Sequence, residues 1–332
     1  MSRSVLVTGA GGFVGRHLGR MLIGEGFAVA GTVLGGPRAA AMGEAVADGV
    51  EPIECDLTSK SRVRAVVRSV RPAAVVHLAA QSHVPTAWKK PELTFRVNVL
   101  GTLHLLQAVE REAPDARVLL VGSAEIYGRA APGGQPVNES QPLAPLNPYA
   151  VSKAAADLLG GQWAASTALH IVRARPFNHT GPGQTGDYVC AAFARQAAAI
   201  ALGRQAPRVV VGNLNVRRDF LDVRDVCRAY LALLRHGEPG GVYNIASGRP
   251  RSIRTILKKL LKFTGRQVQV VVDPNKFRPA DQPVLCGDAG RLRAATGWRP
   301  AIPFDQTLRD MFEWWKQQIE HSDSGGGRET NQ

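Results

Sequence analysis

The sequence predicts an α/β fold: a Rossmann-type, doubly wound parallel sheet with a smaller, interleaved α/β substrate domain. Two observations predict it. Short valine-rich segments alternate with helical patterns, and a glycine-rich turn follows the first of these segments. The expected strands lie at residues 4–8, 27–33, 51–55, 74–78, 117–121 and 170–175. Strands that are apolar at successive positions are typical of a parallel sheet covered by helices on both faces.

Helical patterns separate these strands at residues 14–24, 60–70 and 96–113. Parallel neighbours need such connections, because the chain must return to the same end of the sheet before the next strand begins. The helices therefore support the parallel arrangement.

The regular alternation of strands and helices ends after Pro176, where Gly, Pro and Asn accumulate before a helix expected at about 188–203. The expected domains are a dinucleotide-binding domain at residues 1–175 plus about 213–245, and a substrate-binding domain at 176–212 and 246–320. Residues 321–332 are small and polar and cannot bury apolar area, which predicts a disordered tail.

The composition describes a folded, basic protein. The 332 residues include 41 Lys and Arg against 27 Asp and Glu, a net charge of +14, and 45% of them are hydrophobic. Basic residues come singly or in pairs, so an anionic substrate or a general bias toward arginine explains the charge better than nucleic acid does. We expect no nucleic-acid partner.

Targeting and metal signals are missing from the sequence. No apolar stretch approaches the ~20 residues that a bilayer span needs, and no signal-peptide cleavage site precedes the first strand. We expect a cytoplasmic protein with no membrane partner. The scattered Cys55, Cys190, Cys227 and Cys286 form neither a zinc pattern nor a disulfide framework, so we expect reduced, mostly buried thiols and no metal site.

Residues 8–15 place three glycines between the first strand and the first helix. Glycine permits a tight turn, close approach of the backbone to a pyrophosphate, and close packing of the helix on the sheet. The helix N-terminus adds oriented N–H groups that attract phosphate. The expected cofactor contacts here are Gly9, Gly12, Phe13, Val14 and Gly15.

The second strand ends without the acidic residue that would bind a ribose 2′-hydroxyl group. Arg38 follows, which favours a 2′-phosphorylated cofactor, poor discrimination between cofactors, or simply a solvated arginine. After the third strand, Asp56, with Leu57 beside it, has two interpretations of equal weight. It binds the adenine amine, or it caps the helix that starts near Ser59. Both NADPH and NADH therefore remain expected cofactors.

Tyr149 and Lys153 are four residues apart in a helical pattern, which places both side chains on one helix face. A neighbouring ammonium group stabilises a phenolate, which would lower the pKa of the tyrosine and suit it to proton transfer. Ser123 follows a strand, at the carboxyl edge where the phosphate loop also opens. A serine hydroxyl group there could polarise a carbonyl group.

These motifs together resemble the extended short-chain dehydrogenase/reductase superfamily. The resemblance rests on TGxxGxxG (Gly9, Gly12, Gly15), HLAA (77–80), Ser123 and YxxxK (Tyr149, Lys153). Further segments, at residues 175–184, 211–226, 278–288 and 296–304, are similar to enzymes that act on GDP-mannose derivatives, and most of all to the GDP-6-deoxy-4-keto-D-mannose reductases. The similarity covers residues 4–318.

The resemblance implies an NAD(P)-dependent nucleotide-sugar oxidoreductase that reduces the C4 keto group of GDP-4-keto-6-deoxy-D-mannose to give GDP-D-rhamnose. Tyr149 would protonate the oxygen, Lys153 would lower the pKa of Tyr149, and Ser123 would polarise the carbonyl group. Further implied cofactor contacts are Ala79, Ala80 and Asn98. Implied substrate contacts are Glu125, Asn178, Arg195, Gly212, Asn213, Arg218, Arg278 and Asp281. The arginines at 218 and 278 would hold the diphosphate, since a guanidinium group pairs bidentately with phosphate oxygens.

Two other functions stay open. The related GDP-mannose 4,6-dehydratases share the fold and the YxxxK motif but need a base at C5, and Glu125 could be that base. Ala124 opposes this, because dehydratases carry an acid or a hydroxyl group at that position and a methyl group transfers no proton; their long basic insertion after the second strand is also missing. The second alternative is a nicotinamide-sensing regulator without catalysis, which the intact Ser, Tyr and Lys set disfavours.

The resemblance further implies a homodimer or homotetramer. Relatives commonly pair the helices that correspond to residues 102–112 and 150–164, and both segments carry apolar residues on more than one face. The alternative is that these residues are buried within the monomer.

Overall fold

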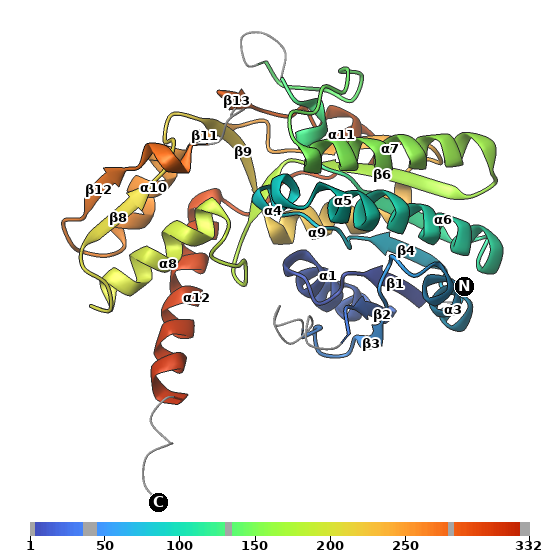
Figure 1. Ribbon diagram of the computed structural model, residues 1–332, viewed down its shortest axis with the longest axis horizontal. Coiled ribbons are helices and arrows are strands. Elements are labelled where there is room, and N and C mark those ends of the chain that lie inside the picture. The colour runs from blue at the N-terminus through green and yellow to red at the C-terminus, as the bar shows by residue number, and fades with distance from the viewer. Residues whose placement is uncertain (1–3, 36–44, 130–134, 278–281, 326–332) are drawn as a thin grey trace, which may run out of the picture.

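A seven-stranded parallel sheet forms the centre of the computed structural model, which describes residues 4–35, 45–129, 135–277 and 282–325 (Figure 1). Its strand order is β10-β6-β5-β4-β1-β2-β3. The strands are β1 Ser4–Thr8, β2 Ala28–Val33, β3 Glu51–Glu54, β4 Ala74–His77, β5 Arg117–Val121, β6 His170–Pro176 and β10 Val242–Ile245. Every neighbouring pair is parallel, so the expected Rossmann-type sheet is confirmed.

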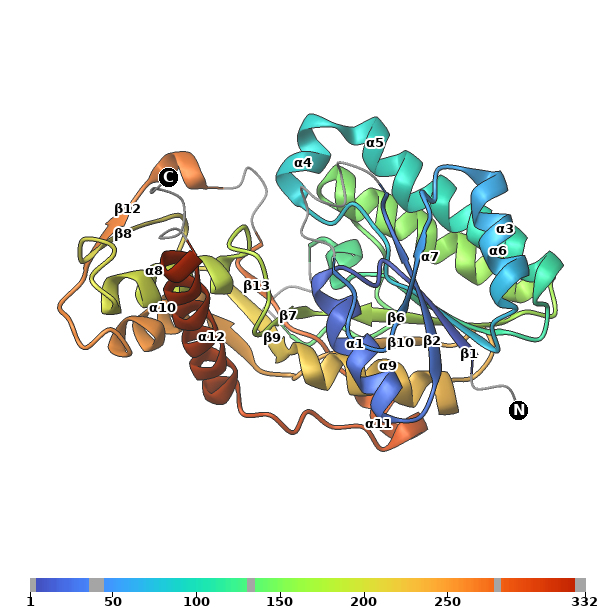
Figure 2. The same cartoon turned by 90° about the horizontal axis from the view of Figure 1, so that it is seen from below.

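Helices cover both faces of this sheet (Figure 2). One face carries α1 (Phe13–Gly24), α9 (Val223–His236) and α11 (Gly290–Thr296). The other carries α3 (Lys60–Val70), α6 (Gly101–Glu112) and α7 (Pro148–Ser166). Each face has its own apolar core, with Leu18 and Val226 on the first and Val67 and Leu106 on the second. The valine-rich strands are needed because each strand side chain meets a helix on one face or the other.

The second, smaller unit lies beside the carboxyl edge of the large sheet. Its helices α8 (Val189–Ala201), α10 (Ile253–Lys262) and α12 (Phe304–Gly325) share one apolar core. Its strands are β7 Asn178–Thr180, β8 Arg208–Val211, β9 Arg217–Asp222, β11 Pro250–Ser252, β12 Gln269–Val272 and β13 Val284–Leu285. β9 pairs with β7, β11 and β13, while β8 pairs with β12.

The chain passes back and forth between the two units. β9 belongs to the small sheet, although residues from about 213 onward were expected to return to the large one. The return begins with α9, and β10 then extends the large sheet beyond β6. The crossing therefore falls at Asp222, which ends β9 and caps α9 by accepting a hydrogen bond from the Arg224 amide.

The end of the described chain differs from expectation. Disorder was predicted from residue 321, but α12 continues to Gly325 and projects from the molecule (Figure 1). His321 and Ser322 extend it by hydrogen bonding to the carbonyl groups of Gln317 and Gln318, one turn earlier, at 2.6 and 2.8 Å. Small polar residues can thus continue a helix that packing has already started.

The four cysteines are buried, free thiols, and burial raises the pKa of each. Of the helices in the described ranges, none combines the length and apolar character that would cross a membrane.

Candidate active site

The phosphate loop lies between β1 and α1, and its geometry explains two of its glycines. Gly9 has φ +71°, and a Cβ atom there would lie 2.9 Å from Ala79 Cα. A Cβ atom on Gly15 would lie 2.4 Å from the Gly9 carbonyl oxygen. The loop and the helix therefore approach more closely than any larger residue allows.

The first turn of α1 faces this loop. The helix begins at Phe13 with Gly12 as its N-cap, a residue that has no side chain to occupy the backbone N–H groups of the first turn. A Cβ atom on Gly12 would meet only the Gly9 carbonyl oxygen, at 3.3 Å. The loop thus presents an exposed backbone surface at a helix N-terminus, which suits a pyrophosphate.

Of the two interpretations of Asp56, the structure excludes the helix cap. Asp56 does not cap α3; Ser59 does, by accepting a hydrogen bond from the Arg62 amide. Asp56 Oδ1 instead accepts hydrogen bonds from the amide and hydroxyl groups of Thr58, at 2.9 and 2.8 Å. Leu57 is buried against Gly101 of α6. Arg38, the other adenosine-side candidate, lies outside the described residues.

The catalytic candidates meet where β5 ends and α7 begins. Ser123 follows β5 and caps η2 (Ala124–Tyr127), with its Oγ accepting a hydrogen bond from the Glu125 amide at 3.2 Å. Asn147 caps α7 by accepting a hydrogen bond from the Ala150 amide at 2.8 Å. This cap starts the helix two residues before Tyr149, and an interaction with Ser123 lowers the pKa of that phenol.

Lys153 lies one helical turn after Tyr149 and is 7% exposed. Its ammonium group donates a hydrogen bond to the Val121 carbonyl oxygen at 2.5 Å. Burial lowers the pKa of Lys153 to about 8, and the negative charge of Asp157 opposes that change. The lysine is therefore mostly charged at neutral pH and loses its positive charge above about pH 8.

The pKa of Tyr149 differs from the expectation. We expected the lysine to lower it, but burial raises the pKa of Tyr149 above its ordinary value, and the interaction with Ser123 only partly opposes this. Desolvation of the phenolate is the largest cause, and the negative charge of Glu125 acts in the same direction. The tyrosine is therefore protonated at neutral pH, as a proton donor must be before it acts.

A buried ion-pair cluster supports this helix and was missed in the sequence. Asp157 Oδ2 accepts a hydrogen bond from Arg175 Nη2 at 2.7 Å, and Oδ1 accepts one from Arg175 Nε at 3.1 Å. Arg173 lies 3.2 Å from the same carboxylate. The only sequence signal was spacing, since Asp157 follows Lys153 by four residues as Lys153 follows Tyr149.

A directed hydrogen-bond chain joins β1, β4 and α6, and it was also missed. Thr102 Oγ1 donates to the Asn98 carbonyl oxygen, so it must accept from His77 Nε2, at 3.0 Å. His77 Nδ1 is then an acceptor, and Thr8 Oγ1 donates to it at 2.7 Å while accepting from the Ala79 amide at 3.2 Å. Burial lowers the pKa of His77 to about 3, which keeps the ring neutral.

Asn98 continues this network toward the catalytic helix. It lies in η1 (Arg96–Leu100) and is 2% exposed. Its Nδ2 donates to Ser152 Oγ at 2.9 Å, and Ser152 in turn donates to the Tyr149 carbonyl oxygen at 2.7 Å. Its Oδ1 accepts from the Gln81 amide at 2.8 Å. Asn98 was expected along the cofactor, whereas here it holds the segment after Ala79 and Ala80.

Glu125 points toward the start of α7, where its Oε2 accepts a hydrogen bond from Asn147 Nδ2 at 3.4 Å. Ala124 beside it is buried, at 3% exposure. A carboxylate is therefore present near Ser123, while the adjacent side chain carries no group that transfers a proton.

The substrate-side candidates lie in the smaller unit. Asn178 begins β7 and pairs with Phe220 of β9, two residues beyond Arg218. Arg218 Nη1 donates to the Gln282 carbonyl oxygen at 2.6 Å. Arg278 and Asp281 lie outside the described residues, on the segment that directly precedes Gln282.

The remaining candidates are more dispersed. The guanidinium group of Arg195 lies 6.0 Å from the ring centroid of Trp315. Gly212 follows β8, and a Cβ atom there would lie 2.8 Å from the Lys276 carbonyl oxygen. Asn213 Oδ1 accepts a hydrogen bond from the Asn215 amide at 3.0 Å. No described contact joins these three residues to Tyr149.

Tyr188 reaches the site without having been predicted. Its hydroxyl group lies 2.9 Å from Ser82 Oγ, which connects the start of α8 with the loop after β4. No sequence motif marked Tyr188.

The fold and this site define a short-chain dehydrogenase/reductase, an enzyme class that carries out oxidation and reduction with NAD(P). The chain belongs to the GDP-mannose 4,6 dehydratase family, whose model matches residues 6–311.

Individual relatives show which enzymes of this family the chain resembles. The chain is 40% identical over 319 residues to a GDP-6-deoxy-D-mannose reductase of Pseudomonas aeruginosa, covering 96% of this chain and 99% of that protein. It is 30% identical to a GDP-mannose 4,6-dehydratase of Sinorhizobium fredii, covering 77% of each. The solved structure of RMD from Pseudomonas aeruginosa complexed with NADPH superposes with a TM-score of 0.81 at 38% identity, over 95% of this chain and 99% of that one. The reductase is thus the nearer relative of these two enzymes.

Proposed function

We propose that this protein reduces the C4 keto group of GDP-4-keto-6-deoxy-D-mannose to GDP-D-rhamnose, with NADPH or NADH as reductant. The observation that carries the proposal is that Ser123, Tyr149 and Lys153 meet at the carboxyl edge of the sheet beside the phosphate loop, where Ser123 acts on the pKa of Tyr149 and Lys153 donates to the carbonyl oxygen of Val121 at the end of β5. The similarity to a GDP-6-deoxy-D-mannose reductase and to a structure that holds NADPH supports the substrate and the cofactor.

The bound nicotinamide would supply the hydride that forms the new C–H bond at C4. Tyr149 donates its phenolic proton to the C4 oxygen, so hydride and proton together convert the C=O bond to an alcohol. Ser123 hydrogen bonds to the same oxygen and favours the charge that develops there. Lys153 stabilises the phenolate left behind, for which its cationic form is required.

The chain's own residues fit a dinucleotide. The backbone surface at Gly12, Phe13 and Val14 would receive the pyrophosphate at a helix N-terminus that no side chain of the described residues caps. Asp56 and Leu57 would border the adenosine, and Ala79 and Ala80 would line the path to the nicotinamide. Arg38 would meet the 2′-phosphate of NADPH.

The sugar nucleotide would extend from Tyr149 into the smaller unit. Asn178 and Arg195 would contact the hexose side, Arg218 with Arg278 the diphosphate, and Gly212 with Asn213 the guanine. Arg218 and the neighbouring Arg217 and Arg254 hydrogen bond to carbonyl and amide oxygens in this unit. Guanidinium groups suit a diphosphate because they pair bidentately with phosphate oxygens.

Glu125 supports a dehydratase as the second candidate, and Ala124 weighs against it. One assay separates the functions. Consumption of NADPH with GDP-4-keto-6-deoxy-D-mannose, and formation of GDP-D-rhamnose, is the expected result. Formation of a 4-keto product from GDP-mannose and NADP⁺ would show that the protein is a dehydratase and not a reductase. No turnover of either substrate at high enzyme concentration, with NADPH still bound, would favour a nicotinamide-binding regulator.

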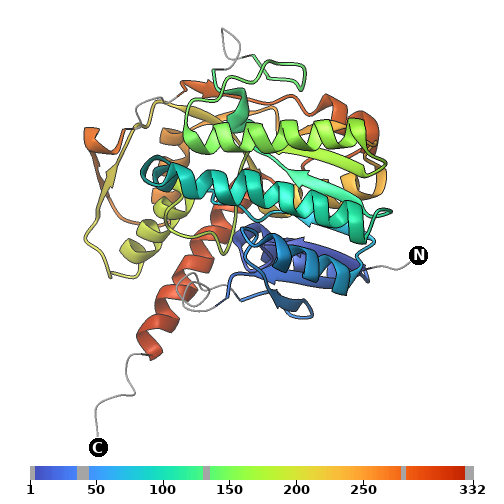
Figure 3. The same ribbon diagram turned by 45° about the vertical axis from the view of Figure 1, so that its right-hand side comes forward.

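We further propose that the protein self-associates as a homodimer, or a homotetramer built from such dimers, through the surface formed by α4 (Val84–Lys89), α5 (Pro91–Phe95), η1 and α7. Large apolar side chains are exposed there, at Trp88, Phe95, Leu100, Val151 and Leu158. In Figure 3, the long helices α6 and α7 lie side by side at the front of the molecule, and η1 also contacts α7. An exposed apolar surface of this kind is typical of an interface.

A further inference from the structure

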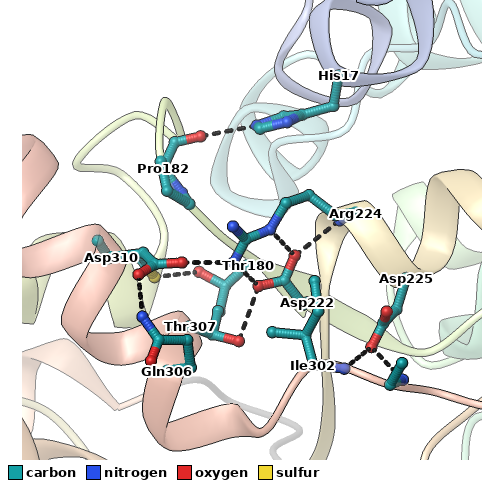
Figure 4. Close-up of polar contacts among 12 residues, drawn as sticks. His17, Thr180, Pro182, Asp222, Arg224, Asp225, Ile302, Gln306, Thr307 and Asp310 are labelled. Atoms are coloured by element: carbon teal, nitrogen blue, oxygen red, sulfur yellow. Dashed lines mark hydrogen bonds and ion pairs between the residues drawn. The ribbon is translucent and has the colours of Figure 1, made fainter. Parts of the chain in front are cut away.

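Three side chains on one face of α1 contact the segment that leads into the substrate unit. Phe13, Arg16 and His17 are spaced by three and four residues, so they are neighbours on the helix surface. His17 Nε2 donates to the Pro182 carbonyl oxygen at 2.8 Å, which Figure 4 shows between α1 and the segment. Arg16 Nη2 donates to the Gly183 carbonyl oxygen at 3.1 Å.

The ring of Phe13 makes the third contact. It stacks on the ring of His179, with centroids 6.4 Å apart and planes 9° from parallel. His179 lies in β7, directly after Asn178, and its Nδ1 lies 3.0 Å from the Phe177 carbonyl oxygen. The stacking therefore fixes the strand that presents Asn178.

Arg16 also contacts the phosphate loop. Its Nη1 donates to the Gly11 carbonyl oxygen at 3.1 Å. A single guanidinium group thus joins the loop that receives the pyrophosphate to the loop before α8. Gly183, with φ +86°, marks the turn that brings its carbonyl group to this position.

The segment is held from its other side by the smaller unit. Thr180 Oγ1 donates to Gln184 Oε1 at 2.6 Å and lies 3.2 Å from Met311 Sδ of α12. Below it, Asp222 accepts hydrogen bonds from Arg224 and from Thr307 of α12 (Figure 4). The segment is therefore clamped between a cofactor-side helix and a substrate-side helix.

The α1 contact needs no charge on the histidine. A carbonyl oxygen only accepts hydrogen bonds, so His17 Nε2 carries the proton in the neutral ring. Burial lowers the pKa of His17, which keeps it neutral. The contact therefore persists across neutral pH and serves as a fixed connection.

We propose that Arg16, with Phe13 and His17, is a positioning residue through which cofactor binding raises the affinity for the sugar nucleotide. The inference rests on the proposed function. These contacts already restrain the segment, and a pyrophosphate held by the phosphate loop would restrain Gly11 further and, through Arg16, Gly183 and β7. The second ligand would then meet a segment that moves less, so it would bind more tightly, and the coupling is reciprocal.

The test measures binding of GDP-D-rhamnose by calorimetry, with and without NADPH. Both compounds are reduced, so no hydride moves between them. In the wild type, NADPH should lower the dissociation constant of GDP-D-rhamnose roughly tenfold, which is within the usual range for coupled sites. In Arg16→Met, which keeps the aliphatic stem but loses the hydrogen bonds to Gly11 and Gly183, this effect should shrink to less than about twofold.

Matched variants separate positioning from damage to the fold. Arg20→Met changes an exposed arginine one turn further along α1 and should keep the full coupling. Retained NADPH binding by Arg16→Met shows that its fold is intact. If that variant does not fold, His17→Phe, which removes only the bond to Pro182, should weaken the coupling instead.

Two results would overturn the proposal: equal GDP-D-rhamnose affinity with and without NADPH in the wild type, or full coupling in both Arg16→Met and His17→Phe. Failure of the wild type to bind GDP-D-rhamnose under any condition would instead overturn the proposed function.

Discussion

At the scale of single residues, Tyr149 and Lys153 show how one buried helix turn sets two opposite pKa changes. Burial disfavours the charged form of each group, so it raises the pKa of the tyrosine and lowers that of the lysine. The change in the tyrosine suits a reduction, because the phenol begins protonated. The change in the lysine limits the pH range, because its ammonium group stabilises the phenolate only while it stays charged.

Replacing Tyr149 with Phe removes the proton donor and little else. We expect kcat to fall by about 10²- to 10⁴-fold, the usual contribution of general acid catalysis, while the affinity for NADPH changes little. Stopped-flow measurement of NADPH oxidation, with NADPH binding as the control, checks this. Activity near the wild-type value would show that another group donates the proton.

The pKa of Lys153 predicts a pH limit. Because it is lowered to about 8, the ammonium group is present below pH 8 and is lost as the pH rises through that value. We expect kcat/KM to decline above about pH 8 for this reason. In Lys153→Arg the decline should disappear from this range, since a guanidinium group stays charged. A wild-type profile that stays flat well above pH 8 would contradict this role.

At the scale of elements, the join between β1 and α1 is the part of the fold most dependent on residue size. The glycines at 9 and 15 are required by backbone contacts, the first through positive φ and the second through close approach. The motif predicted both requirements correctly, because a tight turn between a strand and a helix is a local property of the chain.

Gly15→Ala tests this join. The new Cβ atom would lie 2.4 Å and 2.6 Å from the carbonyl oxygens of Gly9 and Ala10, so the loop must move. We expect a loss of about 1–3 kcal/mol in the free energy of unfolding, the usual cost of overpacking, together with weaker NADPH binding. Chemical denaturation and calorimetry measure the two effects.

Gly24→Ala is the matched control at the other end of α1, where a Cβ atom would meet nothing within 4 Å. It should stabilise the protein slightly, by about 0.4–1 kcal/mol, because alanine restricts the unfolded chain. Equal effects of the two variants would contradict the close approach at Gly15.

At the scale of the whole molecule, the proposed function needs residues from both interleaved units. Ser123, Tyr149 and Lys153 come from the large sheet and its helix, while Asn178 and Arg218 come from the small sheet. The chain crosses between them at Asp222 and again after β10, so neither unit is a continuous stretch of sequence.

Self-association is the prediction that belongs to this scale. Leu158 is 60% exposed on α7, and Leu158→Glu should convert a sedimenting dimer into a monomer, because a charge at the centre of an apolar interface is costly. Val270→Glu, at a 40% exposed valine of β12 in the other unit, should leave the dimer intact. A wild-type monomer at micromolar concentration would contradict the proposed interface.

The sequence by itself determined the parallel sheet and the glycine-rich loop, and it marked Ser123, Tyr149 and Lys153 as catalytic candidates, since alternating patterns and short motifs involve residues close together in the chain. Tertiary structure decided what periodicity cannot encode. It turned Asn98 inward, paired Asp157 with Arg175, directed the hydrogen bonds of His77, and placed Arg16 between two loops. These contacts join residues far apart in sequence, and only the packing of helices on the sheet brings their polar groups within hydrogen-bonding distance.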